Sequence, residues 1–166
     1  MKKRSSSAAL VCALLLSALF FLSACSGGSG GADGSGDAGG SILTPDEAGT
    51  LVIPTAALTT EARFYDYKTE DATVQIVALR DGNGTVHAAF NTCQSCSPSP
   101  KAYYAQDGDR LICQNCGFDF TAEEVGITHG GCNPWPIPGV EITGDEIRIP
   151  ADAAEDMRPV FAAEGR

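Results

Sequence analysis

The pattern of hydrophobic and polar residues predicts short β-strands over most of the chain. Residues 63–67 alternate between polar and aromatic side chains, as a strand with one buried face does. Residues 73–80 are rich in β-branched and apolar side chains, and a second apolar stretch at 85–91 follows the sequence DGNG at 81–84. Because Gly and Asn accept the backbone angles of tight turns, these stretches predict a β-hairpin.

Further along the chain the same signals recur, and helical signals are few. Two more pairs of short strands are expected around turns rich in Gly and Asp: 102–105 with 110–113, and 140–143 with 146–149. Thr121 and Glu124 have the spacing of a capping box that opens one helical turn, and residues 150–157 predict a short helix. The fold class expected is therefore mostly β, a small antiparallel β domain.

The N-terminus has a different pattern, which is typical of export. Basic residues at 2–4 precede an apolar run at 8–22, and small residues then lead to Cys25. We expect a signal peptide over 1–24. The sequence LSAC at 22–25 resembles the bacterial lipobox, in which the Cys is lipidated after cleavage; an ordinary signal peptide that happens to precede a Cys is the alternative. Lipidation at Cys25 would anchor the protein in the cell membrane, on its extracytoplasmic face, without a transmembrane helix.

Composition divides the remainder into a tether and a folded part. Residues 25–41 comprise the lipidated Cys and a linker of mainly Gly, Ser, Ala and Asp, which cannot bury a core. Residues 42–166 are expected to form the metal-binding β domain. The chain has 21 acidic and 11 basic residues, and three of the basic ones lie in the signal. This acidic balance argues against nucleic acid as a partner.

Cysteine spacing carries the strongest chemical signal. Cys93 and Cys96 form one C-x2-C pair, and Cys113 and Cys116 form another, sixteen residues further on. Each such knuckle can direct two thiolates at one metal, so two knuckle loops predict a tetrahedral thiolate site or an iron–sulfur cradle. Disulfides are the alternative in an oxidising compartment. A C-x2-C disulfide closes a very short loop, however, and the number of remaining cysteines is odd, so the sequence favours metal.

The remaining cysteine, Cys132, lies in a Gly- and Pro-rich segment and is a candidate fifth or alternate ligand. The alternative is that Cys132 is a small buried residue behind a turn and binds no metal. His129 stands three residues before it and could be a ligand or a hydrogen-bond donor to one, although a lone loop His is more often neither. Trp135 and the prolines around it are expected to shield the centre from water.

The order of motifs around the second knuckle resembles the cluster-binding part of a Rieske domain. A ligand knuckle is followed by Gly-aromatic-x-Phe, a Gly-rich turn, a Pro-rich loop and a closing hairpin. Rieske knuckles each carry one Cys and one His. Here Cys96 and Cys116 occupy the His positions, so the ligand chemistry differs.

A closer resemblance covers residues 64–138. The strand FYDY at 64–67, the two knuckles, Tyr103 and the sequence GGCNP at 130–134 are similar to the FtrD-like family of bacterial membrane-associated iron–sulfur proteins. The resemblance implies an iron–sulfur cluster and electron transfer linked to iron uptake or reduction, with a redox partner or an iron permease system as partner.

Two other functions stay open at this point. One is a structural zinc-binding interaction module, and the other is a metal chaperone. The chain shows no nucleotide fingerprint, no Ser/His/Asp set and no paired acid–base carboxylates. The sequence therefore favours an electron-transfer protein over an autonomous enzyme.

Overall fold

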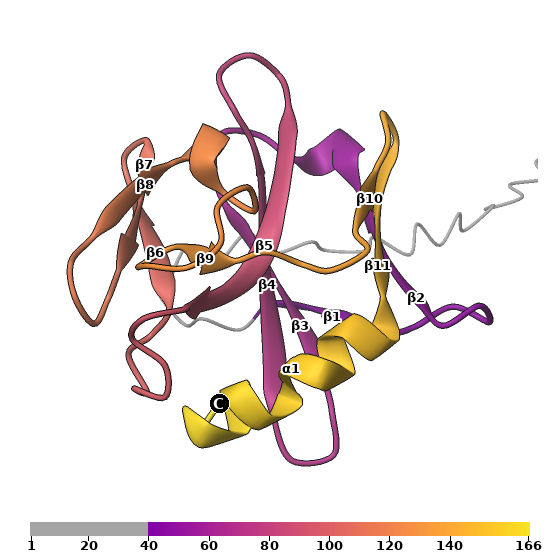
Figure 1. Ribbon diagram of the computed structural model, residues 1–166. Helices are drawn as coiled ribbons and strands as arrows, with labels where there is room; N and C mark the ends of the chain where they lie inside the picture. The colour runs from indigo at the N-terminus through magenta and orange to yellow at the C-terminus, as the bar shows by residue number, and fades with distance from the viewer. Residues whose placement is uncertain (1–39) are drawn as a thin grey trace, which may run out of the picture. The chain divides into compact units, whose positions relative to one another are not determined.

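A computed structural model describes residues 40–166, which contain three β-sheets and one α-helix (Figure 1). The central sheet has the strand order β1-β3-β4-β5-β9, with bounds Ser41–Leu43, Arg63–Lys68, Thr73–Arg80, Val86–Cys93 and Pro134–Trp135. A second sheet has the order β10-β11-β2, with bounds Glu141–Ile142, Glu146–Pro150 and Thr50–Pro54. The third has the order β6-β7-β8, with bounds Tyr104–Asp107, Arg110–Cys113 and Asp119–Thr121.

The predicted mostly β fold is confirmed. All strand pairs in the described part are antiparallel except β1 with β3, and each of the three expected hairpins is present. Two short 3-10 turns, Thr55–Ala57 and Ala122–Glu124, complete the elements together with helix α1, Ala151–Ala163. The capping box is formed, since the Thr121 backbone N–H donates to Glu124 Oε2 at 2.8 Å.

Both faces of the central sheet are buried, and each face supports its own core. Because side chains alternate along a strand, Ile76 and Phe90 face one way while Val77 and Ala89 face the other. The first core joins the former face to the sheet of β2 and β11 and to α1. The second core joins the latter face to β6, β7 and β8. Figure 1 shows the two small sheets on opposite sides of the central one.

Helix α1 is longer than the sequence pattern predicts. It continues beyond Met157 to Ala163 and contains Pro159, a residue that removes one helical hydrogen bond. The buried side chains of Ala154, Met157 and Phe161 pack into the first core. Burial of each large apolar side chain contributes about 1.5–3 kcal/mol, which offsets the roughly 3 kcal/mol cost of an internal proline.

Buried polar contacts fix the end of β5, where the first predicted ligand lies. Asn91 accepts a hydrogen bond from the Tyr104 backbone N–H at 2.9 Å and donates to Gln75 Oε1 at 2.8 Å. The Thr92 hydroxyl donates to the buried carboxylate of Glu164 at 2.5 Å. Arg166 pairs with that carboxylate and donates to the Asn91 carbonyl at 2.7 Å. The strand end is therefore held by β4, by β6 and by residues after α1.

Candidate metal centre

The first knuckle begins at the last residue of β5. Cys93 is fully buried, and its carbonyl accepts hydrogen bonds from the backbone N–H groups of Cys96 and Ser97, at 3.1 and 3.0 Å. These contacts fold residues 93–97 into a tight turn, which brings the Cys96 side chain back to the same side as Cys93. The Cys93 N–H donates to the Ala102 carbonyl at 2.7 Å, so the base of the turn is closed by backbone bonds.

The second knuckle repeats this arrangement at the end of β7. The Cys113 carbonyl accepts from the Gly117 N–H at 2.9 Å, and the Cys113 N–H donates to the Phe118 carbonyl at 2.8 Å. Gly117 has φ +75°, a left-handed conformation that glycine adopts without steric cost. The turn leaves Cys116 exposed, whereas Cys113 is buried in the second core.

A third segment, residues 125–133, brings Cys132 to the two knuckles. Val125 is buried in the second core, and Gly126 lies so close to β5 that a Cβ there would meet the Ala88 carbonyl oxygen at 2.3 Å. Further on, Gln94 of the first knuckle accepts a hydrogen bond from the Gly130 N–H at 2.8 Å. Its own backbone N–H donates to the Asn133 carbonyl at 3.2 Å. The segment is therefore tied to the first knuckle on both sides of Cys132.

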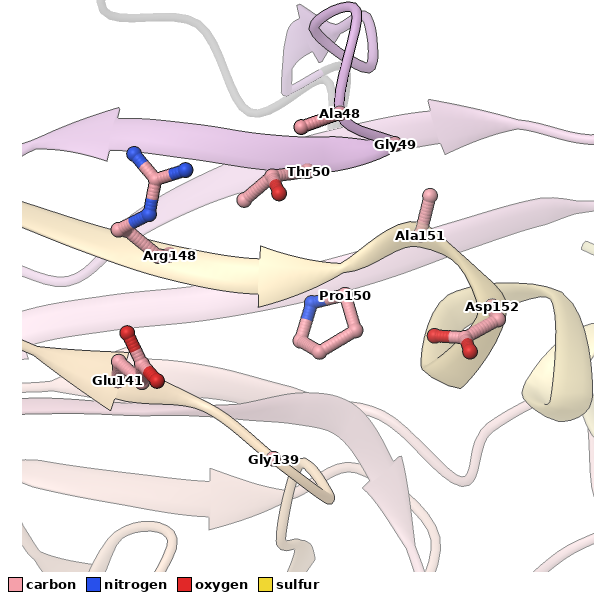
Figure 2. A pocket seen from close by; sticks show the side chains of 9 residues that line it. All are labelled: Ala48, Gly49, Thr50, Gly139, Glu141, Arg148, Pro150, Ala151 and Asp152. Atoms are coloured by element: carbon pink, nitrogen blue, oxygen red, sulfur yellow. The ribbon is translucent and has the colours of Figure 1, made fainter.

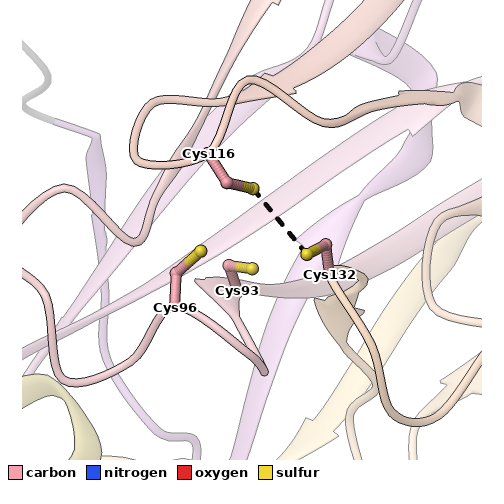
Figure 3. Close-up of side chains that lie close together, drawn as sticks. All are labelled: Cys93, Cys96, Cys116 and Cys132. Carbon is pink, nitrogen blue, oxygen red and sulfur yellow. Dashed lines mark hydrogen bonds between the residues drawn. The ribbon is translucent and has the colours of Figure 1, made fainter.

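Four sulfur atoms converge at the meeting point of these three segments. The Sγ atoms of Cys93, Cys96, Cys116 and Cys132 all lie within 4.8 Å of one another, and Figure 3 shows their side chains directed at a common centre. The sulfur atoms of Cys116 and Cys132 are 3.7 Å apart. No disulfide joins any of the five cysteines in the described part of the chain.

This group differs by one member from the quartet expected from spacing. Cys132, the candidate further ligand, belongs to it, whereas Cys113 does not. Cys113 remains close by, with its sulfur 3.8 Å from that of Cys96. His129 is exposed and is not a member of the group. Trp135 packs against the first core, on the face of the sheet opposite the second core, so the expectation that it shields the centre is wrong.

The environments of the thiols set their protonation. A hydrogen bond from the Phe118 backbone N–H is the main reason that the pKa of Cys116 is lowered to about 7. Burial raises the pKa of Cys113 to about 12 and that of Cys132 to about 11. Burial alone would raise the pKa of Cys93. Hydrogen bonds from Tyr104 and Cys96 outweigh this effect, so the pKa of Cys93 is lowered. Since the thiolate is the form that ligates a metal, Cys93 and Cys116 are the thiols best prepared to bind.

Tyr104 is a contact of the centre that cysteine spacing could not reveal. Its buried hydroxyl donates its one proton to the Cys132 carbonyl oxygen, and the Cys93 sulfur lies close enough to share that proton. Burial, followed by the nearby Cys93, raises the pKa of the phenol, so the hydroxyl stays protonated and remains a donor. The side chain thus supports one ligand through its sulfur and another through its backbone.

Replacing Tyr104 with Phe is expected to lower the reduction potential of a centre held here. A hydrogen bond to a ligand sulfur stabilises the more negative, reduced state, so its loss disfavours reduction. A bond worth about 1 kcal/mol more in the reduced state corresponds to roughly 40 mV for one electron. Voltammetry of Tyr104→Phe beside Tyr103→Phe checks this, because the Tyr103 ring lies under Arg166. Equal potentials in both variants and the wild type would refute a role for the Tyr104 hydroxyl.

A separate hollow of ≈ 550 Å³ lies along β2, β11 and the start of α1 (Figure 2). None of the five cysteines lines it. Its one basic side chain, Arg148, is paired with Glu146 at 3.0 Å and with Asp46 at 3.7 Å. The one basic group of this hollow is therefore already paired with two carboxylates that lie outside its lining.

The fold and the site together define a class, the small β proteins with a cysteine group that could hold a metal. Residues 58–161 match the family described as membrane iron-sulfur containing protein FtrD-like, and this span is more than half of the sequence. The chain belongs to the FtrD-like family. No curated protein and no solved structure matches it. Between residues 40 and 166 there is no helix with the length and apolar character needed to cross a membrane.

Proposed function

We propose that this protein is a membrane-anchored iron–sulfur protein that transfers electrons in iron uptake or reduction. The observation that carries the proposal is the convergence of four cysteine sulfurs within 4.8 Å of one another. Membership of a membrane iron-sulfur family supports iron as the metal. An iron centre bound by thiolates would supply one-electron redox chemistry.

The residues of the chain suit this role by controlling access to the centre. Cys93 is buried, and Tyr104 and the second core enclose it on the protein side. Cys116 is exposed, so one edge of the group reaches the surface, where a redox partner can approach. An iron permease system is the partner class that an iron-transport role requires, because transported iron must be delivered in a defined oxidation state.

Anaerobic purification followed by metal analysis, visible spectroscopy and voltammetry tests the proposed function. We expect bound iron, thiolate-to-iron absorption that bleaches on reduction, and a reversible one-electron wave. A colourless protein with stoichiometric zinc would contradict electron transfer and would support the zinc-binding interaction module instead. Metal that is lost on simple dilution would support the metal chaperone.

The membrane anchor is proposed at Cys25, after a signal peptide of residues 1–24 and before a linker ending at 41. Residues 1–39 lie outside the described residues, whereas Ser41, the expected end of the linker, is described and begins strand β1. Cys25→Ala is expected to move the protein from the membrane fraction to the soluble fraction, because the acceptor thiol for the lipid is removed. Cys12→Ala is the matched control, since it changes a cysteine inside the expected signal. Fractionation with immunoblotting measures both variants. A wild-type protein found entirely in the soluble fraction would refute the anchor.

A further inference from the structure

We infer that Cys93, Cys96, Cys116 and Cys132 hold a single metal ion in a tetrahedral cage, without inorganic sulfide, and that Cys113 is not a ligand. The identity of that ion as iron rests on the proposed function. The number of ions and the choice of ligands rest on the geometry of the sulfur atoms.

The first argument is the spacing of the sulfurs. A tetrahedral ion with metal–sulfur bonds of about 2.3 Å has sulfur–sulfur edges of about 3.8 Å. The Cys116–Cys132 separation is 3.7 Å, and no separation within the group exceeds 4.8 Å. The longest separation allowed thus exceeds the ideal edge by about 1 Å, a difference that small rotations about the Cα–Cβ bonds can remove. The group already has the dimensions of one coordination sphere.

The second argument is what a larger cluster would require. In a cluster, each iron atom binds bridging sulfide as well as cysteine, so thiolates on different irons are separated by the width of the iron–sulfide core. That separation is greater than the edge of a single tetrahedron. All six sulfur–sulfur separations in this group are short, whereas a two-iron cluster needs two close pairs set apart from each other. A polynuclear core does not fit between these sulfurs without moving the knuckles.

The third argument is the position of the fifth thiol. Cys113 lies at the end of β7 with 1% of its surface exposed, and it packs in the second core with Leu111 and Phe120. Its sulfur is near that of Cys96, at 3.8 Å, but it is not among the four that are mutually close. Cys132 takes the fourth place because residues 125–133 are held against β5 and the first knuckle. Each of the three segments then contributes at least one ligand.

The test is stoichiometry in the full-length protein purified anaerobically in detergent. Iron, zinc and acid-labile sulfide are measured per chain in the wild type, Cys132→Ser and Cys113→Ser. We expect one metal ion and no sulfide in the wild type. Cys132→Ser should lower metal occupancy about tenfold or more, because a ligand is lost, whereas Cys113→Ser should retain it within about twofold.

The outcomes separate this inference from the proposed function. Two or more irons with equivalent sulfide would overturn the single-ion cage and leave the iron function standing. One zinc without sulfide would leave the cage standing and overturn the iron function. Retention of metal in Cys132→Ser together with its loss in Cys113→Ser would overturn the ligand assignment. If either variant fails to fold, the wild-type ratio of metal to sulfide still decides the number of ions.

Discussion

Removal of the metal with a chelator is expected to lower the melting temperature by about 15 °C or more, which corresponds to a loss of about 5 kcal/mol or more. The physical reason is that the cysteine group cross-links three segments that are far apart in the sequence: the end of β5, the turn after β7 and the loop that carries Cys132. Without the ion, the thiolates of Cys93 and Cys116, the two thiols whose pKa is lowered, also repel one another.

The loss of order after chelation should be uneven. Cys93 and Cys113 belong to the second core and Cys96 and Cys132 pack against it, whereas none of the five cysteines belongs to the first core. Hydrogen exchange should therefore accelerate in β6, β7 and β8 and change little in β2 and β11. Calorimetry gives the overall effect, and mass spectrometry of deuterium uptake gives its location. The same chelation applied to Cys93→Ser is the control and should cause no further change; an unchanged wild-type melting temperature would show that no ion supports the fold.

Gly126→Ala is expected to destabilise the protein by about 3 kcal/mol or more. Gly126 has φ +76°, which costs a residue with a side chain roughly 1–2 kcal/mol. In addition, the new Cβ would lie 2.3 Å from the Ala88 carbonyl oxygen, so the loop must move away from β5. That movement would disturb the packing of buried Val125 and would displace Cys132, so metal occupancy should also fall.

Gly130→Ala provides the matched control for this prediction. Gly130 has a similar φ of +79°, but nothing lies within 4 Å of the position where its Cβ would stand. Gly130→Ala is therefore expected to lower the free energy of unfolding only through the unfavourable positive φ, by roughly 1–2 kcal/mol. Denaturant unfolding of both variants gives the difference. Equal losses of stability would mean that the close approach of Gly126 to Ala88 has no energetic importance.

The three long strands of the central sheet, β3, β4 and β5, could be predicted because their signals are local. Alternation and β-branched residues located β4 and β5, and the sequence DGNG located the turn between them. The short strands β1, β2, β8 and β9 were not predicted, because two to five residues give too little periodicity. The extension of α1 through Pro159 was also missed, since it depends on burial of Phe161 against strands far away in the sequence.

The candidate site was predictable only where it depends on spacing. Each C-x2-C pair predicts a knuckle from local sequence alone, and both knuckles are present as turns at the ends of strands. The place of Cys132 in the group depends on the approach of Gly126 to β5 and on the bond between Gly130 and Gln94. These contacts join segments more than 30 residues apart, so no local pattern encodes them. Tyr104 was missed for the same reason, because an aromatic residue in a strand usually indicates packing.

The division of the interior into two cores has a consequence for how such a protein can diversify. Residues such as Ile53, Ile149 and Met157 act on stability through the first core alone. Substitutions at well-separated positions contribute almost additively to the free energy of unfolding. Substitutions in the first core can therefore change the melting temperature while the surroundings of the cysteines stay constant. Strand β5 places Phe90 in the first core and Cys93 in the second. Substitutions in this strand can therefore affect both cores at once.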